Sequence, residues 1–186
     1  MAVHHSPSDC APAVLRFWFE EVGEQRWFAK SEALDSECER RFGAVRASVL
    51  ASHARAWRDR PDHLLAAIIL LDQFSRNLHR VSAKAFEGDP LALELTNIAL
   101  DRGWDQAMPP SQRQFLLMPL MHSERLAYQQ RPLVDFERLS DDDVLNFARL
   151  HHDQIARFGR FPGRNASLGR RTTEAEQVAL DAGAAF

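Results

Sequence analysis

The chain has 186 residues, 45% hydrophobic and 26% charged, which is the composition of a globular protein with a hydrophobic core. Its formal net charge of −3 argues against nucleic acid or an anionic membrane as a partner. The longest apolar run, residues 64–71, is too short to span a bilayer, and the N-terminus lacks the pattern of a signal peptide. We therefore expect a single cytoplasmic domain, residues 1–186, with residues 1–8 as a flexible extension.

Helix signals follow one another along the chain, and strand signals are scarce. A first helix is predicted over about residues 9–21, with Gly23 just past its end, and a second over about residues 33–53. Pro61 suits the first turn of a third helix, which continues to about Asn77.

The two cysteines, Cys10 and Cys38, lack the close spacing of a metal or redox motif. A disulfide framework would need more cysteines, so we expect two free thiols, as is usual in a reducing compartment. We expect neither a metal ion nor another cofactor.

The third predicted helix is apolar on nearly all sides over residues 64–71, so its neighbours should bury it. Asp72 follows directly and should be buried too. A buried carboxylate needs partners, and Arg76, four residues on, lies on the same face.

Further polar residues extend this pair into a stripe. Gln73 and Asn77 are also four residues apart and form a second pair, and Arg80 continues the direction of Arg76. Such a stripe suits either a structural network of ion pairs between helices or the wall of a ligand pocket.

The next segments have helix-capping patterns. Asp89 can cap a helix that has Pro90 in its first turn and that Gly103 terminates. Ser111 and Gln114 have the spacing of a capping box.

The segment 115–126 is an apolar helix that contains Pro119, which removes a backbone donor and predicts a kink. His122 and Glu124 follow. They are two residues apart, so they can serve one site only if the turn there is distorted. For His122 and for His151 we consider packed, satisfied histidines, general acid–base groups and metal ligands.

Two capping patterns lie near the C-terminus. Ser140 precedes three acidic residues that suit the positive end of a helix, and Thr173 with Glu176 has capping-box spacing. Together these signals predict an all-α fold of about seven to nine helices.

Residues 157–171 contain five arginines and no acidic residue. Arginine presents a planar fork that suits carboxylate or phosphate. The cluster is compatible with an anion site, a solvated basic surface or a nucleic-acid patch, although the last would need interleaved aromatic residues over a longer face.

Aromatic residues gather near the N-terminus. They suit the packing of the first helices, and the two indoles could instead form the wall of a pocket. These residues are Phe17, Trp18, Phe19, Trp27 and Phe28.

Several motifs together resemble a bacterial family catalogued as domain of unknown function 924. They are "FWFEE", "RWFAK", "IILLDQFSRN", "FLLMPLMHSE", "ARFGRFPGRN" and the final "AGAAF". The resemblance runs from about Val14 to Phe186 and implies an all-α, tetratricopeptide-like array of antiparallel helix pairs. It implies no established reaction. The chain departs from the family pattern at Ser75, where proline is usual, and at Gly163, where histidine is frequent.

We predict that the polar segments converge on a pocket for an anionic small molecule or an acidic peptide. The alternatives are an enzyme, a hydrolase or lyase with His122 or His151 as acid–base, and a protein-interaction scaffold with internal ion pairs. The candidate catalytic residues are His122, Glu124 and His151. The candidate ligand-binding residues are Asp72, Arg76, Asn77, Arg157, Arg160, Arg164 and Asn165.

Overall fold

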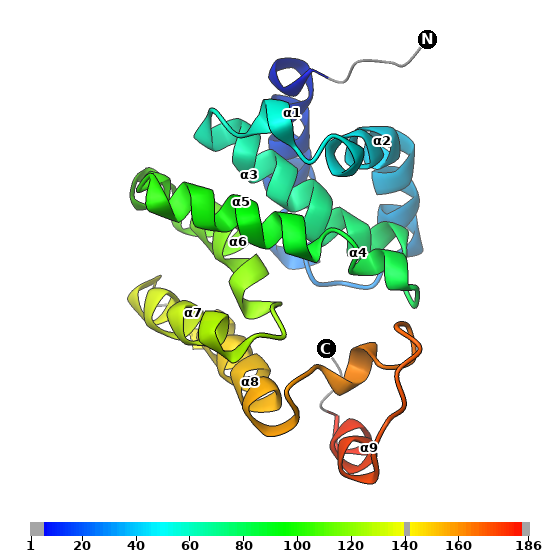
Figure 1. Cartoon of the computed structure of the whole chain (residues 1–186). Coiled ribbons are helices and arrows are strands. Elements are labelled where there is room, and N and C mark those ends of the chain that lie inside the picture. Colours follow the sequence, from blue (N-terminus) through cyan, green and yellow to red (C-terminus); the bar gives the residue numbers. More distant parts are fainter. Residues whose placement is uncertain (1–5, 140–141, 184–186) are drawn as a thin grey trace. The chain divides into compact units, whose positions relative to one another are not determined.

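The structure is a computed structural model, and it describes residues 6–139 and 142–183. The described residues form helices and no strand, which confirms the all-α prediction (Figure 1). None of the described helices has the length and apolar character needed to cross a bilayer. The tetratricopeptide-like arrangement remains a prediction.

The chain divides into two compact units, and the boundary falls inside helix α6. Unit 1 comprises Met1–Arg80 and Lys84–Leu116, and unit 2 comprises Val81–Ala83 and Leu117–Phe186. The organisation as a single domain stays a prediction.

Unit 1 is built from helices that pack around α3. α1 and α5 both contact α3, and α2 contacts the turn that follows it. The helices are α1 (Pro7–Arg16), α2 (Glu32–Ala51), α3 (Pro61–Ile69), α4 (Ser75–Leu78), α5 (Asp89–Asp101) and the first part of α6 (Pro110–Met121). Short 3-10 turns lie at Glu24–Arg26, Arg55–Trp57, Ala83–Ala85 and Trp104–Ala107.

Two π-helical turns interrupt the regular helices of unit 1. η1 (Phe17–Val22) continues α1 to Gly23, and η4 (Leu70–Phe74) joins α3 to α4. The first and third predicted helices are therefore confirmed in extent, but each contains a π turn. Periodicity did not indicate these turns, because each continues an α-helix and begins with apolar residues.

The π turns bring aromatic residues together in the core of unit 1. The ring centroid of Phe74 lies 5.9 Å from that of Phe17 and 5.4 Å from that of Trp18. Trp18 also meets Phe115 at 5.5 Å. The predicted aromatic packing is confirmed for these side chains, whereas Phe28 is 61% exposed and stacks on Phe115 from outside.

The residues Leu64 to Leu71 are completely buried, as the apolar pattern predicted. The start of α5 approaches them closely at Gly88. A Cβ atom at this position would lie 2.6 Å from the carbonyl oxygen of Leu71, so only glycine fits without a shift of the backbone.

Two of the predicted helix caps are wrong. Gly88 is the N-cap of α5 and Asp89 is its first residue, so Asp89 does not cap. α6 begins at Pro110, which places Ser111 inside the helix. The Thr173–Glu176 capping box is confirmed, with both hydrogen bonds formed, and Ser140 lies outside the described residues.

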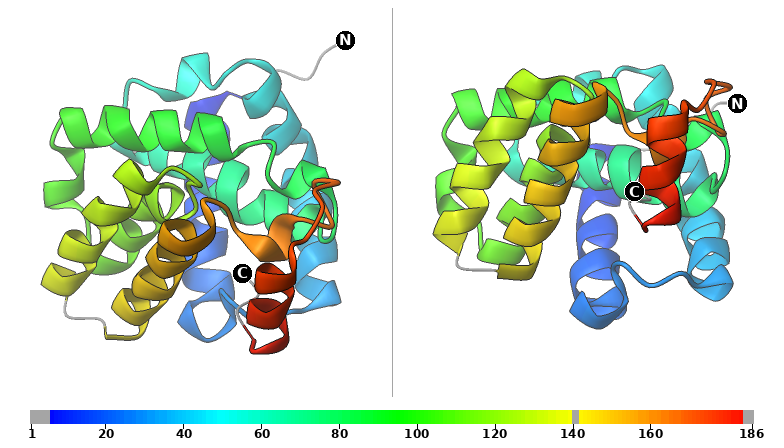
Figure 2. Two further views of the ribbon diagram at one scale, coloured as in Figure 1. Left: turned by 60° about the horizontal axis from the view of Figure 1, so that its bottom comes forward. Right: turned by 90° about the horizontal axis from the view of Figure 1, so that it is seen from below.

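Unit 2 contains the end of α6, a pair of longer helices and a short last helix. α7 and α8 lie side by side (Figures 1 and 2). A segment with one 3-10 turn leads from α8 to α9, and Gly159 and Gly169 in it have φ of +68° and +64°. The elements are α7 (Leu126–Leu139), α8 (Asp142–Phe158), η7 (Pro162–Arg164) and α9 (Glu174–Asp181).

Substitution of Gly88 by alanine should lower the free energy of unfolding by about 1–3 kcal/mol, because the new methyl group would overlap a backbone carbonyl. Gly43 is the matched control. It lies inside α2, where the added Cβ meets only the movable carboxylate of exposed Glu39. Gly43→Ala should therefore raise the free energy of unfolding by about 0.5–1 kcal/mol. Urea unfolding of both variants tests this pair, and equal effects would contradict it.

Candidate functional site

The predicted pairing of Asp72 with Arg76 is confirmed in unit 1. Asp72 is 1% exposed, and its carboxylate lies 3.1 Å from the Arg76 guanidinium and accepts a hydrogen bond from Gln73 at 2.5 Å. Arg76 also donates to both oxygens of Asp89, at 3.0 and 3.1 Å. The guanidinium thus ties the start of α5 to the polar end of the helix formed by α3, η4 and α4.

Asn77 and Arg80 share a different partner. The carboxylate of Asp35 on α2 accepts a hydrogen bond from Asn77 at 2.7 Å and two from Arg80 at 2.5 and 2.8 Å. Partial burial raises the pKa of Asp35, but these hydrogen bonds lower it more, so the pKa lies below its usual value. The predicted pairing of Asn77 with Gln73 is therefore wrong: Asn77 on α4 bonds Asp35 on α2 instead.

Ser75, which departs from the family pattern, has a clear structural role. Its buried hydroxyl donates to the Leu71 carbonyl at 2.5 Å and accepts from Nε of Arg46 at 3.0 Å. Proline could make neither contact. The polar residues at this end of unit 1 thus join its helices to one another, which supports the reading of the stripe as a structural ion-pair network.

In unit 2, α6 ends at Met121, so His122 and Glu124 lie in a connecting segment and not on a regular helix. The ring centroids of His122 and His151 are 5.8 Å apart. His151 is buried; its Nδ1 donates to the Phe147 carbonyl at 2.7 Å. This is the environment of a packed histidine.

Glu124 has partners for both of its oxygens. It accepts hydrogen bonds from Arg170 at 2.7 and 2.8 Å and from the backbone N–H of Phe161 at 2.9 Å. Partial burial raises the pKa of Glu124, but the hydrogen bonds from Arg170 and Phe161 outweigh this effect. The pKa therefore lies below its usual value. Arg170 and the Phe161 N–H thus favour the ionised form of Glu124.

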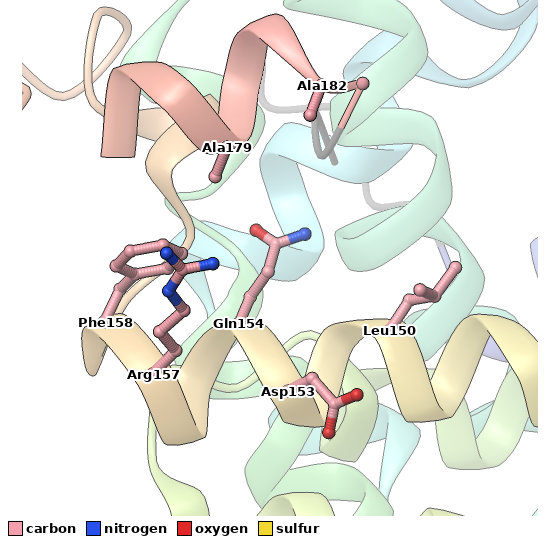
Figure 3. A pocket seen from close by; sticks show the side chains of 8 residues that line it. Leu150, Asp153, Gln154, Arg157, Phe158, Ala179 and Ala182 are labelled. Atoms are coloured by element: carbon pink, nitrogen blue, oxygen red, sulfur yellow. The ribbon is translucent and has the colours of Figure 1, made fainter. Parts of the chain in front are cut away.

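Residues of α8, of α9 and of the turn after α9 line an open groove in unit 2, called here the α8–α9 groove (Figure 3). Its volume is about 280 Å³. Its walls are partly apolar, and Gln154 and Arg157 project from α8 toward α9. The lining residues are Leu150, Asp153, Gln154, Arg157, Phe158, Ala179, Ala182 and Gly183.

The amide of Gln154 is the unusual group of the α8–α9 groove. The side chain is 6% exposed, and neither its oxygen nor its nitrogen has a hydrogen-bond partner among the described residues. Sequence reasoning missed this residue, because a glutamine on a helix gives no signal that its amide will lack a partner.

Arg157 and Arg164 differ in exposure. Arg157 is exposed, its guanidinium lies 4.8 Å from the ring centroid of Phe158, and no carboxylate of the described residues pairs with it. Arg164 is buried and lies over the ring of Phe161 at 4.5 Å. Of these two predicted ligand-binding arginines, Arg157 is therefore the one that a ligand in the groove could reach.

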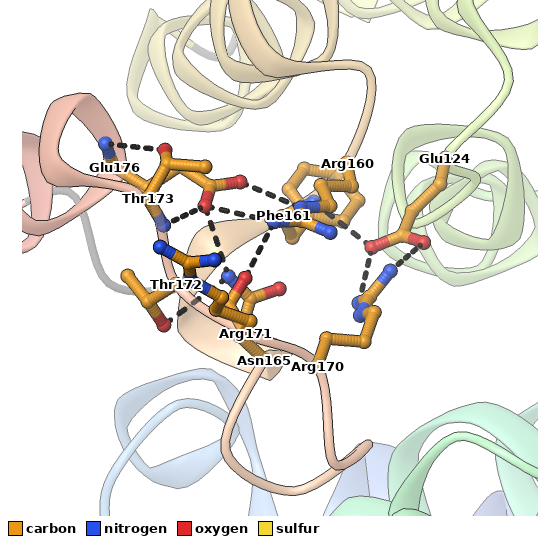
Figure 4. A network of polar contacts seen from close by, with 9 residues as sticks. All are labelled: Glu124, Arg160, Phe161, Asn165, Arg170, Arg171, Thr172, Thr173 and Glu176. Carbon is orange, nitrogen blue, oxygen red and sulfur yellow. Dashed lines mark hydrogen bonds and ion pairs between the residues drawn. The ribbon is translucent and has the colours of Figure 1, made fainter.

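A buried carboxylate fixes the start of α9 (Figure 4). Glu176 is 2% exposed and accepts two hydrogen bonds from Arg160, at 2.6 and 2.9 Å. It also accepts from the backbone N–H of Thr173 at 2.7 Å and from the Asn165 amide at 3.3 Å. Chiefly the Arg160 bonds, and then the Thr173 N–H, lower the pKa of Glu176 from 4.5 to about 2.

The predicted site residues thus form two groups. Asp72, Arg76 and Asn77 belong to unit 1, and the other seven belong to unit 2. That they form one pocket stays a prediction. No group of three or more His, Cys, Asp or Glu side chains within residues 6–139 and 142–183 could hold a metal ion.

A family model described as bacterial protein of unknown function (DUF924) matches residues 14–184. The chain belongs to the DUF924 family. It is also similar to a solved structure titled "Structure of Protein of Unknown Function ATU0120 from Agrobacterium tumefaciens", with 35% identity and a TM-score of 0.88. The match covers 95% of this chain and 99% of that one. A search of curated proteins found no match.

Protonation of Glu176 should destabilise unit 2. Because its pKa in the folded state is about 2 and its usual value is 4.5, the stabilisation is fully present above pH 4.5 and is lost as the pH falls toward 2. Glu176→Gln should therefore melt at a lower temperature than the wild type at pH 7, and the difference should shrink toward pH 2.

Glu174→Gln is the matched control, since Glu174 is exposed in the same first turn of α9. Its melting temperature should stay close to that of the wild type over the whole pH range. A difference between Glu176→Gln and the wild type that does not change with pH would contradict the prediction.

Proposed function

We propose that the protein binds a small anionic molecule in the α8–α9 groove of unit 2. The observation that carries the proposal is the Gln154 amide, which is buried beside the groove and has no partner among the described residues for either polar atom. Arg157, one helical turn further along α8, supplies the positive charge.

A buried amide without partners is unfavourable by about 1–3 kcal/mol relative to a bonded one. Native proteins retain few such groups, and a ligand is one source of the missing hydrogen bonds. The Gln154 amide is shielded from solvent, so a ligand would reach it after a rotation of this side chain or a small shift of α9. The hydrogen bonds gained would then offset part of the cost of ordering the ligand.

Arg157 suits the anionic end of the ligand. Its guanidinium is exposed and rests against the ring of Phe158, which limits its motion while leaving the fork available. A carboxylate can accept two parallel hydrogen bonds from such a fork.

In this proposal the other predicted residues of unit 2 act indirectly. Arg160 and Asn165 hold Glu176 and thereby the start of α9, which carries one wall of the groove. Arg170 holds Glu124. Arg164 packs against Phe161. These residues would be needed for the shape of the groove and would not touch the ligand.

A second candidate is a protein-interaction scaffold. The observation that favours it is the pairing of the carboxylates Asp72, Glu124 and Glu176 with arginines of the same unit.

We further propose a cytoplasmic location, which the two free thiols support. The alternative of an acid–base enzyme is weakened by the pairing of these carboxylates with arginines and by the packing of His151.

The binding proposal predicts that a simple branched carboxylate, 4-methylpentanoate, binds the wild type weakly. Arg157→Gln should weaken this binding at least about tenfold, because it removes the charged fork. Arg171→Gln is the control: Arg171 is also exposed but lies outside the groove, so its loss should leave binding unchanged. NMR titration measures the affinities, and equal losses in the two variants would point to unspecific attraction of anions.

A further inference from the structure

We infer that the ligand of the α8–α9 groove is an N-acylated α-amino acid carboxylate, either free or as the C-terminus of a peptide. This inference rests on the proposed function and specifies its ligand. It follows from the position of two side chains, the Gln154 amide and the Arg157 guanidinium, on one face of α8.

The spacing of the two polar groups carries the first step. Residues three apart on a helix are neighbours on one face, with about 5–6 Å between their Cβ atoms. Gln154 and Arg157 have this spacing and both project toward α9 (Figure 3). One small molecule whose two polar groups lie close together can therefore meet both side chains.

The chemistry of the two side chains carries the second step. The Gln154 amide offers one acceptor and one donor group, and neither has a partner in the described part of the chain. A peptide group can meet one of them, either with its N–H donor or with its carbonyl acceptor, because these two groups point in opposite directions in a trans peptide. The Arg157 fork matches a carboxylate. A peptide group and an α-carboxylate are joined by one α-carbon, so one N-acylated amino acid can bond both Gln154 and Arg157.

The remaining walls of the groove carry the third step. Leu150 on α8, Ala179 on α9 and Ala182 just after α9 are apolar, and the alanines leave room for an aliphatic side chain. The volume of about 280 Å³ lies just below the range of ligand pockets, about 300–1000 Å³, so only a small ligand fits. The groove thus suits a single acylated residue with an aliphatic side chain.

Three probes separate the contributions of the polar groups. N-acetyl-leucine has both the amide and the carboxylate, N-acetyl-leucinamide lacks the carboxylate, and 4-methylpentanoate lacks the acylated amine. N-acetyl-leucine should bind the wild type at least about tenfold more tightly than either of the other two. N-acetyl-leucinamide loses the contact with the Arg157 guanidinium, and 4-methylpentanoate loses the hydrogen bond with the Gln154 amide.

Two variants assign each preference to its residue. Gln154→Leu removes the partnerless amide and should fold at least as stably as the wild type. It should lose the preference for N-acetyl-leucine over 4-methylpentanoate and keep the preference over N-acetyl-leucinamide. Arg157→Gln should show the reverse pattern.

The tripeptide Ala-Ala-Leu distinguishes the two sources of the ligand. Tighter binding of the tripeptide than of N-acetyl-leucine would indicate the C-terminus of a peptide, and equal or weaker binding would indicate a free acylated amino acid. If 4-methylpentanoate binds as tightly as N-acetyl-leucine, the inference is overturned and the proposed carboxylate site stands. If neither carboxylate binds, the proposed function fails as well.

Discussion

A carboxylate that leaves water must find cationic or hydrogen-bond-donating partners, and this constraint organises the polar parts of both units. Asp72 is 1% exposed and meets Arg76, and Glu176 is 2% exposed and meets Arg160. The first pair joins the helices of unit 1 and the second fixes the start of α9. Arginines that serve buried carboxylates in this way are not available to a ligand. Arg157 pairs with no carboxylate of the described residues, and the proposed site uses it.

The sequence predicted those contacts that follow from local spacing. Asp72 and Arg76 are four residues apart on one helix, and Thr173 and Glu176 have capping-box spacing; both contacts form. The second partner of Glu176, Arg160, lies 16 residues away across a turn. No periodic rule relates these positions, because the path of the chain between α8 and α9 decides which side chains meet.

The predictions that failed, or were missing, concern residues whose role depends on their surroundings. Asp89 has the position of a cap before a proline, but its carboxylate binds Arg76 and the helix begins at Asp89 itself. The basic segment 157–171 has no acid of its own, yet carboxylates from outside it pair with Arg160 and Arg170. That the Gln154 amide has no partner among the described residues could not be foreseen, because it depends on which residues of α9 lie opposite this side chain.

The side-chain amide signals of Gln154 in proton–nitrogen correlation NMR test the central claim most directly. Gln154→Leu identifies these signals by their loss from the spectrum. The account predicts that saturating N-acetyl-leucine shifts them strongly, because the amide gains the hydrogen bonds that it lacks in the free protein. Signals of Gln154 that stay in place while the ligand shifts others elsewhere would contradict the account and move the binding site away from the α8–α9 groove.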